Sequence, residues 1–445
     1  MAIIIPMPWN SKEPGPDAER IAALGAGLSE VANDPAPHVD RLEALRELLD
    51  LSAEARGNPA GPGGRIELID SPTGERIAVL ANEVICRTAD LDAVAEAIDG
   101  LGARILEREF DEAIGIVRVA IDEESLAATD MGLPGVLTRC TELGLLAGPN
   151  EVTMQGGGWR AKAQTSPEPT DRPFGDRPTR GPGSGITVAV IDGGFATDPR
   201  ADDWFATVVG PNDAGEPLDS DNVPGLDAGA GHGTFVTGIV LQVAPGCTVR
   251  QYRMLNSSGF GSAWRLKDAI VQAVADGCDI INLSVGFEPG SEHGSLPMTA
   301  CMHTIPANVL VVAAAGNSGS AVPVAPAALK GVIAVGALDG NLEGVLWSNH
   351  GPWIDVSCVG EGVVSTFVPG TEEPGALPSS TTFDAPDPIA LWSGTSFAAP
   401  QVTGRLAQLR SVGLSSADAI SALRAAAVQE NGPADPLFGY RLRIL

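Results

Sequence analysis

The sequence predicts a large, doubly wound α/β domain with a mostly parallel sheet, preceded by a small α+β domain. Three observations lead to this fold class. Continuous apolar runs alternate with helical segments from residue 186 to 445, which is typical of a parallel sheet covered by helices on both faces. Residues 65–155 instead follow the order β-α-β-β-α-β. A Pro/Gly-rich stretch at 156–185 separates the two patterns and indicates a linker.

The N-terminal 64 residues form a separate segment in this interpretation. Residues 17–56 show helical periodicity, with leucines 42, 45, 48 and 49 on one face, and the run "GNPAGPGG" ends the pattern at 64. We therefore expect a small helical arm over 1–64, to which the sequence assigns no role.

The small domain at 65–155 is expected to contain four strands and two helices. Apolar runs at 76–88, 105–110, 115–121 and 151–155 indicate the strands, and segments 90–104 and 133–147 have helical spacing. This order is the split, ferredoxin-like arrangement, which many unrelated small α+β domains share.

The large domain is expected to carry its functional residues at one edge of the sheet. Strands are predicted at 186–192, 248–255, 279–285, 308–316 and 331–338, with a helix at 266–277 between two of them. In parallel sheets of this kind, functional residues gather beyond the carboxyl ends of the strands.

Composition excludes several classes of partner. The chain has 445 residues and is 44% hydrophobic, which is enough to bury a sizeable core. Its 28 Lys and Arg against 56 Asp and Glu give a formal net charge of −28, so nucleic acid and anionic membrane surfaces are not expected partners.

The N-terminus and the cysteines point to a cytoplasmic protein. The start "MAIIIPMPWNSKEPG" lacks the basic residue and the cleavage site of a signal peptide, and no apolar run is long enough to span a membrane. None of the six cysteines has the spacing of a metal site, and we expect buried free thiols rather than disulfides. No cofactor or metal is predicted.

Three residues together indicate nucleophilic catalysis. Asp192 ends a predicted strand before two glycines, His232 lies in "GHGTFVTGIV", and Ser396 lies in "SGTSFAAPQVTG", where most residues on both sides of it are small. A serine hydroxyl needs an imidazole to accept its proton, and the imidazole needs a carboxylate to fix its tautomer. Each residue alone also fits a structural role, Asp192 in a strand-end turn and the other two as helix caps.

These motifs resemble those of the subtilisin-like serine protease family, over residues 186–445. "VAVIDGGF" is similar to the Asp motif of that family, "GHGTFVTGIV" to its His motif and "SGTSFAAPQVTG" to its Ser motif, in the order known for subtilisin. The resemblance implies a serine endopeptidase acting on proteins or peptides.

Further site residues follow from the resemblance. "VVAAAGNSG" matches the segment that carries the oxyanion asparagine, which falls on Asn317. Two segments match the strands that hold an extended substrate on either side. Their residues are Ser284, Val285 and Gly286 on one side and Gly259, Phe260 and Gly261 on the other.

The P1 pocket, by the same resemblance, has Val324 near its floor and no acidic residue in "NSGSAVPVAP". Desolvation disfavours an unpaired Lys or Arg in such a pocket, so small or medium apolar P1 residues are expected. The family also carries a cis proline where Ala325–Pro326 falls.

The chain departs from the family pattern at several places. Phe235, Phe397 and Gln401 stand where the family usually has His, Met and His. The connection "IVLQVAPG" lacks the longer loop that binds calcium in secreted members, so no calcium is expected there. An insertion at 368–390 precedes the Ser motif as a flap or a solvated loop, and its acidic residues are Glu372, Glu373, Asp384 and Asp387.

The N-terminal domain acquires a role from the resemblance. Subtilisin-like proteases are commonly made with a ferredoxin-like propeptide that blocks the active site, and the domain at 65–155 has the corresponding pattern and position. We expect a zymogen that cleaves itself between about 154 and 165. Two alternatives remain: a processing peptidase dedicated to one precursor or partner protein, and a catalytically silent scaffold whose N-terminal domain binds a partner.

Overall fold

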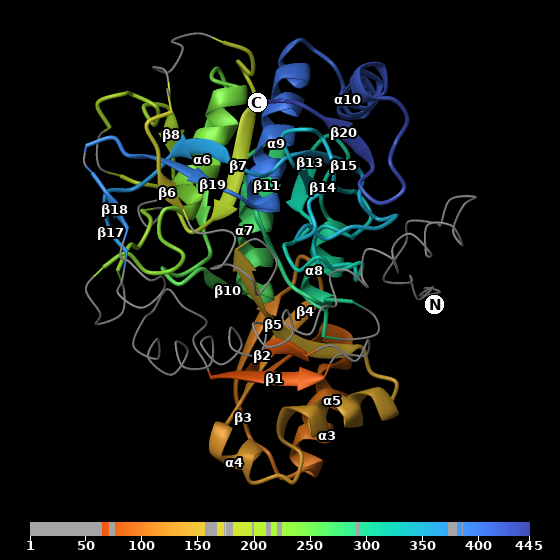
Figure 1. Cartoon of the computed structure of the whole chain (residues 1–445). Coiled ribbons are helices and arrows are strands. Elements are labelled where there is room, and N and C mark those ends of the chain that lie inside the picture. The colour runs from red at the N-terminus through yellow and green to blue at the C-terminus, as the bar shows by residue number, and fades with distance from the viewer. Residues whose placement is uncertain are drawn as a thin grey trace.

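A computed structural model describes most of the chain from residue 65 onward. It covers residues 65–70, 76–155, 167–172, 174, 181–197, 200–210, 215–219, 225–290, 294–372, 381–384 and 386–445. The predicted arm at 1–64, Glu373 and much of the predicted linker at 156–185 lie outside these residues. Figure 1 shows two bodies, with the N-terminal domain below the larger C-terminal one.

The N-terminal domain is an antiparallel sheet with helices on one face. Its strands are β1 (Ile66–Asp70), β2 (Arg76–Arg87), β3 (Ile105–Asp111), β4 (Ile116–Ile121) and β5 (Ala147–Gln155). A short 3-10 turn η2 (Thr88–Asp90) leads into α3 (Leu91–Gly100), and α4 (Glu123–Ala127) and α5 (Gly132–Glu142) follow β4. From β2 onward, the longer elements follow the β-α-β-β-α-β order, with sheet order β5-β2-β4-β3 and β1 added beside β2.

The core of this domain lies between the sheet and its helices. Val84 and Val119 of the strands pack with Val94 and Ile98 of α3 and Val136 of α5, and all five side chains are fully buried. Since alternate residues of a strand face opposite sides, the other face of the sheet is free to meet the C-terminal domain.

The C-terminal domain is built on an eight-stranded sheet in which every pairing is parallel. Its order is β20-β15-β14-β13-β11-β7-β9-β8. These strands are β7 (Thr187–Asp192), β8 (Val208–Val209), β9 (Thr248–Arg253), β11 (Ile280–Leu283), β13 (Leu310–Ala314), β14 (Val332–Leu338), β15 (Val356–Val359) and β20 (Tyr440–Leu442).

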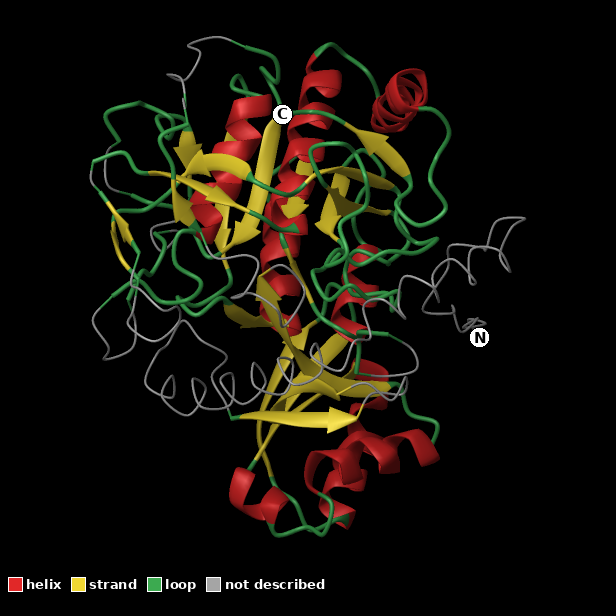
Figure 2. Cartoon of the chain, in the orientation of Figure 1, coloured by secondary structure: helices red, strands yellow, loops and turns green. Residues whose placement is uncertain are grey.

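Helices cover both faces of this sheet, as Figure 2 shows in red. One face carries α6 (His232–Val243), α9 (Thr395–Ser411) and α10 (Ser416–Asn431), and the other carries α7 (Ala263–Ala275) and α8 (Leu296–Met302). Side chains of β7 alternate between the two faces of the sheet. Val188 and Val190 belong to the core on the α6 side, whereas Ala189 and Ile191 belong to the core on the α7 side. Both faces are dry, which explains the continuous apolar runs.

Small sheets surround the main one. Strand β19 (Ile389–Trp392) lies between β16 (Val363–Thr366) and β6 (Glu168–Pro169) and pairs with both, while β17 (Gly370–Thr371) pairs with β18 (Thr382–Phe383). The pairing of β6 differs from the expectation of an unstructured linker, because Glu168 and Pro169 extend a sheet edge of the C-terminal domain.

The two domains share a sheet. Strand β5 pairs with β2 inside its own domain, and its last residues also pair with β10 (Phe260–Ser262) and β12 (Val285–Gly286) of the C-terminal domain. An ion pair adds to this junction: Lys267 Nζ lies 2.8 Å from Asp111 Oδ2 and 3.8 Å from the centre of the Trp264 ring. Lys267 is only 1% exposed, so Asp111 neutralises a buried cation from across the junction.

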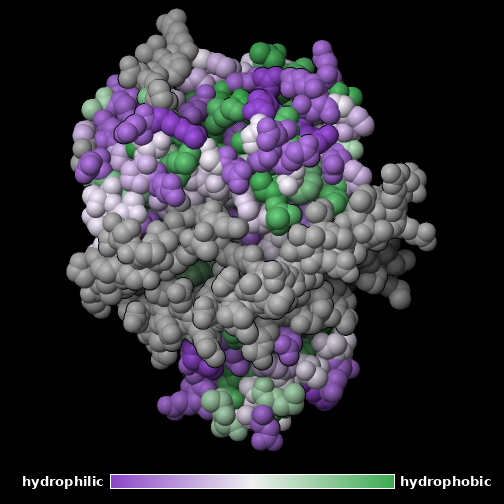
Figure 3. Space-filling view, viewed as in Figure 1, coloured by the Kyte–Doolittle hydropathy of each residue, from purple (hydrophilic) through white to green (hydrophobic). Residues whose placement is uncertain are grey.

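Two expectations about the chain, for its cysteines and for one proline, are confirmed. All six cysteines are buried and free, and the peptide bond at Ala325–Pro326 is cis. Within the described ranges, none of the helices is both long and apolar enough to cross a bilayer. Figure 3 shows hydrophilic side chains spread over both ends of the visible face, with small apolar patches between them.

Candidate active site

Three neighbouring strands of the parallel sheet end at the candidate site. Strands β13, β11 and β7 are adjacent in the sheet. Asp192 is the last residue of β7, Ser284 directly follows β11, and Asn317 lies three residues after the end of β13. The carboxyl ends of parallel strands meet at one edge, so residues far apart in the sequence become neighbours there.

Asp192 and His232 form a buried hydrogen-bonded pair. Asp192 Oδ1 lies 2.8 Å from His232 Nδ1 and also accepts a bond from the backbone N–H of Gly193 at 2.7 Å. The two side chains are 0% and 3% exposed. Because the carboxylate faces Nδ1, it favours the tautomer that carries its proton there, which leaves Nε2 as the base.

Helix α6 carries the imidazole on its first residue and begins directly after a glycine with a left-handed backbone conformation. His232 is its first residue, and Gly231 before it has φ = +81°, where a side chain is disfavoured. A Cβ on Gly231 would also lie 2.4 Å from the ring of Phe367. The imidazole itself packs against two aromatic rings that also contact each other, Trp392 at 5.6 Å and Phe397 at 5.4 Å between centroids.

Ser396 is the second residue of α9 and lies at the same edge. Its hydroxyl donates to the carbonyl of Ser284 at 3.2 Å. Among the described residues, no hydrogen bond joins Ser396 to His232. The residue after Ser396, Phe397, contacts the imidazole of His232, with ring centroids 5.4 Å apart.

Pro400 in the first turns of α9 has a local explanation. Proline has no N–H, so the carbonyl of Ser396, four residues earlier, loses its usual partner within the helix. The hydroxyl of Ser284 donates to that carbonyl at 2.9 Å, and Asn282 donates in turn to the Ser284 hydroxyl at 3.0 Å. The end of β11 therefore fixes the turn of helix that carries Ser396.

The side chain of Asn317 is held at the start of α9. Its Oδ1 accepts two bonds from Thr395, one from the backbone N–H at 2.9 Å and one from the hydroxyl at 2.8 Å. The amide oxygen is therefore occupied, and a Cβ on Gly394 would lie 3.6 Å from the Nδ2 atom. Asn317 is 8% exposed.

The six residues expected to hold an extended chain lie on β10 and around β12, and β5 occupies the space between them. Phe260 pairs with Met154 and Gly261 with Thr153 on one side. Val285 pairs with Gln155 and Gly286 with Met154 on the other.

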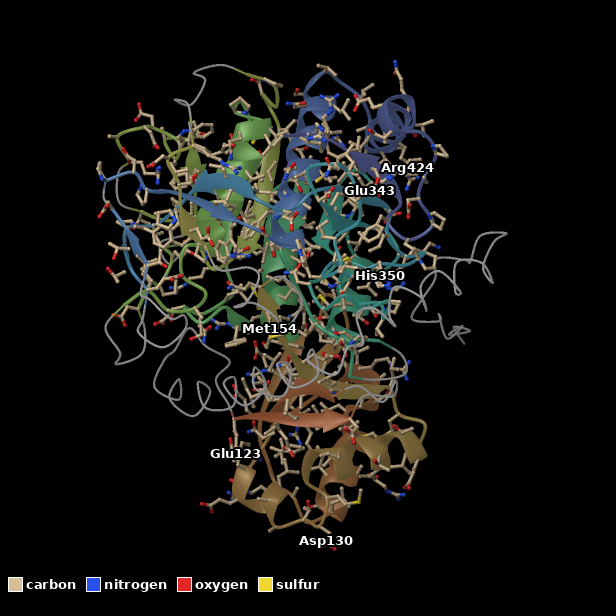
Figure 4. All side chains as sticks on the ribbon, viewed as in Figure 1. Glu123, Asp130, Met154, Glu343, His350 and Arg424 are labelled. Carbon is tan, nitrogen blue, oxygen red and sulfur yellow. The ribbon has the colours of Figure 1, made fainter. Side chains whose placement is uncertain are left out.

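Glycines make this approach possible. Gly259 accepts a bond from the backbone N–H of Gln155 at 3.1 Å, and a Cβ at Gly259 would lie 2.8 Å from the Gln155 side chain. A Cβ at Gly261 would lie 3.0 Å from the Thr153 hydroxyl. In Figure 4, Met154 lies at the junction of the two domains, far from Glu123 and Asp130 at the outer end.

Val324 lies deeper than the other expected site residues. It is 2% exposed and belongs to the core on the α7 side of the sheet, next to the cis bond at Ala325–Pro326. Ala325 pairs with Phe287, which follows β12, so this segment supports the strand that faces β5. The role of Val324 in a P1 pocket stays a prediction.

The departures from the family motifs are neighbours in space. Phe235 and Phe397 pack on each other with centroids 4.6 Å apart, and both contact Trp392. Gln401 is fully buried, and its amide donates to the carbonyls of Val359 and Phe397. The sequence interpretation missed Trp392, although an aromatic residue four positions before Ser396 was a visible signal.

The described residues at the C-terminal end of the insertion contact the segment at Arg200 and Ala201. Arg200 donates to the carbonyls of Phe367 and Pro388, and its Nε lies 4.0 Å from Asp387. Asp387 also accepts from the N–H of Ala201, so its carboxylate is occupied there. Within the described residues, no three His, Cys, Asp or Glu side chains are grouped as metal ligands.

Comparison with known proteins identifies the family. The model of the subtilase family (Peptidase_S8) matches residues 183–440, more than half of the chain. The chain belongs to the subtilase family. The family predicted from the sequence is thereby confirmed.

Two relatives match more than half of the chain. The chain is 32% identical over 275 residues to the thermophilic serine proteinase of Bacillus sp. (strain AK1), and the match covers 60% of each protein. It is 31% identical over 260 residues to thermitase of Thermoactinomyces vulgaris, covering 56% of this chain and 84% of thermitase. It thus spans less than two thirds of the first of these relatives.

A solved structure confirms the α/β fold. Fervidolysin from Fervidobacterium pennivorans, described as a keratinolytic enzyme related to subtilisin, aligns with a TM-score of 0.58 at 18% identity. The alignment covers 82% of this chain and 60% of fervidolysin. It therefore includes residues N-terminal to those matched by the family model.

Proposed function

We propose that the chain is a serine endopeptidase in which Asp192, His232 and Ser396 form the catalytic triad. The observation that carries this proposal is the buried Asp192–His232 pair, next to a serine at the start of α9. In this proposal His232 Nε2 accepts the Ser396 proton during attack on a peptide carbonyl and later delivers it to the leaving amine. Asp192 orients the imidazole and stabilises its cation.

The oxyanion of the tetrahedral intermediate is bound by Asn317 and by the start of α9. Asn317 Nδ2 is the donor that the two bonds from Thr395 leave available. The backbone N–H of Ser396, in the first turn of α9, is unbonded within the helix and supplies the second donor. Preorganised donors of this kind stabilise developing charge without rearranging during the reaction.

The N-terminal domain acts as an intramolecular inhibitor, so the chain is a zymogen. Support comes from β5, whose residues Val152–Gln155 complete an antiparallel sheet between β10 and β12. A substrate held by backbone pairing needs the same two edges, and β5 excludes it. Protein or peptide chains are the substrates because this recognition reads backbone.

An active-site probe tests the proposed chemistry. A fluorophosphonate should label the processed wild-type chain, and the Ser396→Ala variant should stay unlabelled. Labelling that persists in Ser396→Ala would exclude this serine as the nucleophile. Absence of both labelling and peptide hydrolysis in the wild type would favour the scaffold alternative.

Self-processing should occur just after β5. Val285 pairs with Gln155, and Ser284, the residue before Val285, accepts the Ser396 hydroxyl through its carbonyl. We therefore expect the bond after Gly156 to be cleaved first, inside the range 154–165 expected from the sequence. Mass spectrometry of wild type and Ser396→Ala tests this, since identical intact masses after long incubation would rule out self-processing.

Specificity at P1 should favour small and medium apolar residues. A library of peptides that differ only at P1 should show a graded preference for Ala, Val, Leu and Met, because one methylene changes transition-state binding by only about 1–3 kcal/mol. Fastest cleavage after Lys or Arg would contradict this and would direct attention to the acidic insertion at 368–390. Proteome-wide cleavage profiling separates a broad peptidase from one dedicated to a single precursor.

A further inference from the structure

Helix α6 begins without a capping side chain of its own. Its N-cap residue is Gly231, which has no side chain to accept bonds from the first turn. The first N–H groups of a helix have no partners within it, and burial without partners destabilises that end. The first turn of α6 carries His232, and every residue from His232 to Leu241 is buried.

Glu216, from a separate segment, supplies the missing acceptor. Its Oε1 accepts from the N–H of Gly233 at 3.1 Å, and its Oε2 accepts from the N–H of Thr234 at 3.2 Å and from the Thr234 hydroxyl. These are the second and third positions of α6, the same groups that an N-cap side chain normally bonds. A negative or polar acceptor there also complements the helix dipole.

The same network fixes the segment after Asp192. The Thr234 hydroxyl accepts from the N–H of Ala196 at 2.8 Å, and the N–H of Glu216 donates to the carbonyl of Phe195 at 3.0 Å. A Cβ on Gly193 would lie 3.3 Å from Glu216 Oε1. Glu216 therefore joins the end of β7, which carries Asp192, to the start of α6, which carries His232.

We propose that Glu216 is a positioning residue for the Asp192–His232 pair. Its carboxyl group holds the first turn of α6 against the end of β7 and thereby sets the distance and angle between Asp192 and the imidazole. This inference rests on the proposed serine-protease function and adds a positioning residue to the triad and Asn317. Glu216 does not act on substrate and works through His232.

The ionisation of Glu216 should give a pH dependence that a purely structural residue would not give. The residue is partly exposed, but its carboxyl group is enclosed, and this burial together with the nearby Asp192 raises the pKa of Glu216 to about 8. The charged groups that face this region are Asp192 on β7, His232 on α6, and Arg253 on β9, whose guanidinium donates to the carbonyl of Gly215. Ionisation near pH 8 thus adds a second negative charge near Asp192 and the first turn of α6, and this charge stabilises the His232 cation in the transition state.

The experiment compares Glu216→Ala and Glu216→Gln in the processed full-length chain. We expect Glu216→Ala to lower kcat by about 10- to 100-fold, since small misplacements of catalytic groups have effects of this size, while KM stays within about twofold. Glu216→Gln should lose less. The wild-type kcat should rise through a step near pH 8 that Glu216→Gln lacks. Asp219→Ala, which changes an exposed carboxylate in the same segment, is the matched control and should behave as wild type.

A second measurement is independent of hydrolysis. In full-length Ser396→Ala, the downfield proton resonance of the His232 Nδ1–H group should be present, and it should show the step near pH 8. Adding Glu216→Gln should remove that step, and adding Glu216→Ala should broaden the resonance. An unchanged resonance and unchanged titration in both double variants would overturn the proposal, as would a kcat of Glu216→Ala within twofold of Asp219→Ala. A wild type without hydrolysis or labelling would overturn the proposed function alone, because this resonance still reports the position of His232.

Discussion

The two sheets that meet at the candidate site contribute to it in different ways. The parallel sheet delivers side chains: Asp192 from the end of β7 and Asn317 from beyond β13. The antiparallel sheet contributes main-chain hydrogen bonds, because β5 lies between β10 and β12 and pairs with both. The proposed chemistry therefore depends on individual side chains, whereas the proposed inhibition depends on an extended strand and on glycines that allow its approach.

The largest loss of kcat is expected at Ser396 and His232, because no other side chain can replace the nucleophile or the base. Ser396→Ala and His232→Ala should each lower kcat by about 10⁶-fold, as removal of a triad serine or histidine does in subtilisin. Among the described residues, the Ser396 hydroxyl makes one bond, to the Ser284 carbonyl, so Ser396→Ala should change the melting temperature little.

Steady-state hydrolysis and thermal unfolding measure both quantities. Ser393→Ala serves as the control, because Ser393 lies three residues away and accepts a bond only from the N–H of Gly362 among its described contacts. Comparable losses in Ser393→Ala and Ser396→Ala would contradict the assignment of Ser396.

The next largest loss of kcat is expected at Asn317, the proposed oxyanion donor. Asn317→Ala should lower kcat by about 10²- to 10³-fold with little change in KM, the range known for loss of one oxyanion donor in subtilisin. Because Asn317 Oδ1 also accepts two bonds from Thr395, the variant should lose some stability as well. A raised KM with unchanged kcat would place Asn317 in substrate binding instead.

The sequence predicted the positions of the three triad candidates better than it predicted the contact of β5 with β10 and β12. Asp192, His232 and Ser396 lie in short motifs whose local chemistry is visible in neighbouring residues, and strand ends predicted their meeting at one edge. The contact of β5 with β10 and β12 joins residues more than 100 positions apart, and its register depends on tertiary packing. Glu216 gave no signal at all, because it lies 16 positions before His232 in a Gly- and Pro-rich segment.

The junction between the two domains should respond to pH through Glu151. This side chain of β5 is 1% exposed, accepts bonds from the N–H of Gly290 and the hydroxyl of Ser295, and has its pKa raised by burial to about 7. A carboxyl group whose pKa is raised on docking stabilises the docked state fully below its free pKa of 4.5. That contribution is lost as pH rises through about 7.

Docking of β5 should therefore weaken between about pH 4.5 and 7, by on the order of 10²-fold. The rate of fluorophosphonate labelling of the intact chain reports how often β5 leaves the site. The ratio of wild-type to Glu151→Gln rates removes the titration of His232, which both proteins share, and this ratio should rise with pH and level off above 7. A ratio independent of pH would show that Glu151 is not responsible.

The smallest effect is expected from side chains of β5 that add little to its backbone pairing, and Gln155 allows a direct test. Its side-chain amide donates to the carbonyl of Ala228 at 3.3 Å, while its backbone N–H donates to Gly259 at 3.1 Å. Gln155→Ala loses the first bond, and because one neutral hydrogen bond contributes about 0.5–1.5 kcal/mol, labelling of the intact chain should accelerate about tenfold or less. Gln155→Pro also loses the backbone donor and disturbs the strand, so it should accelerate labelling far more. Equal rates for the two variants would show that the side chain, and not the backbone, holds this end of β5 in the site.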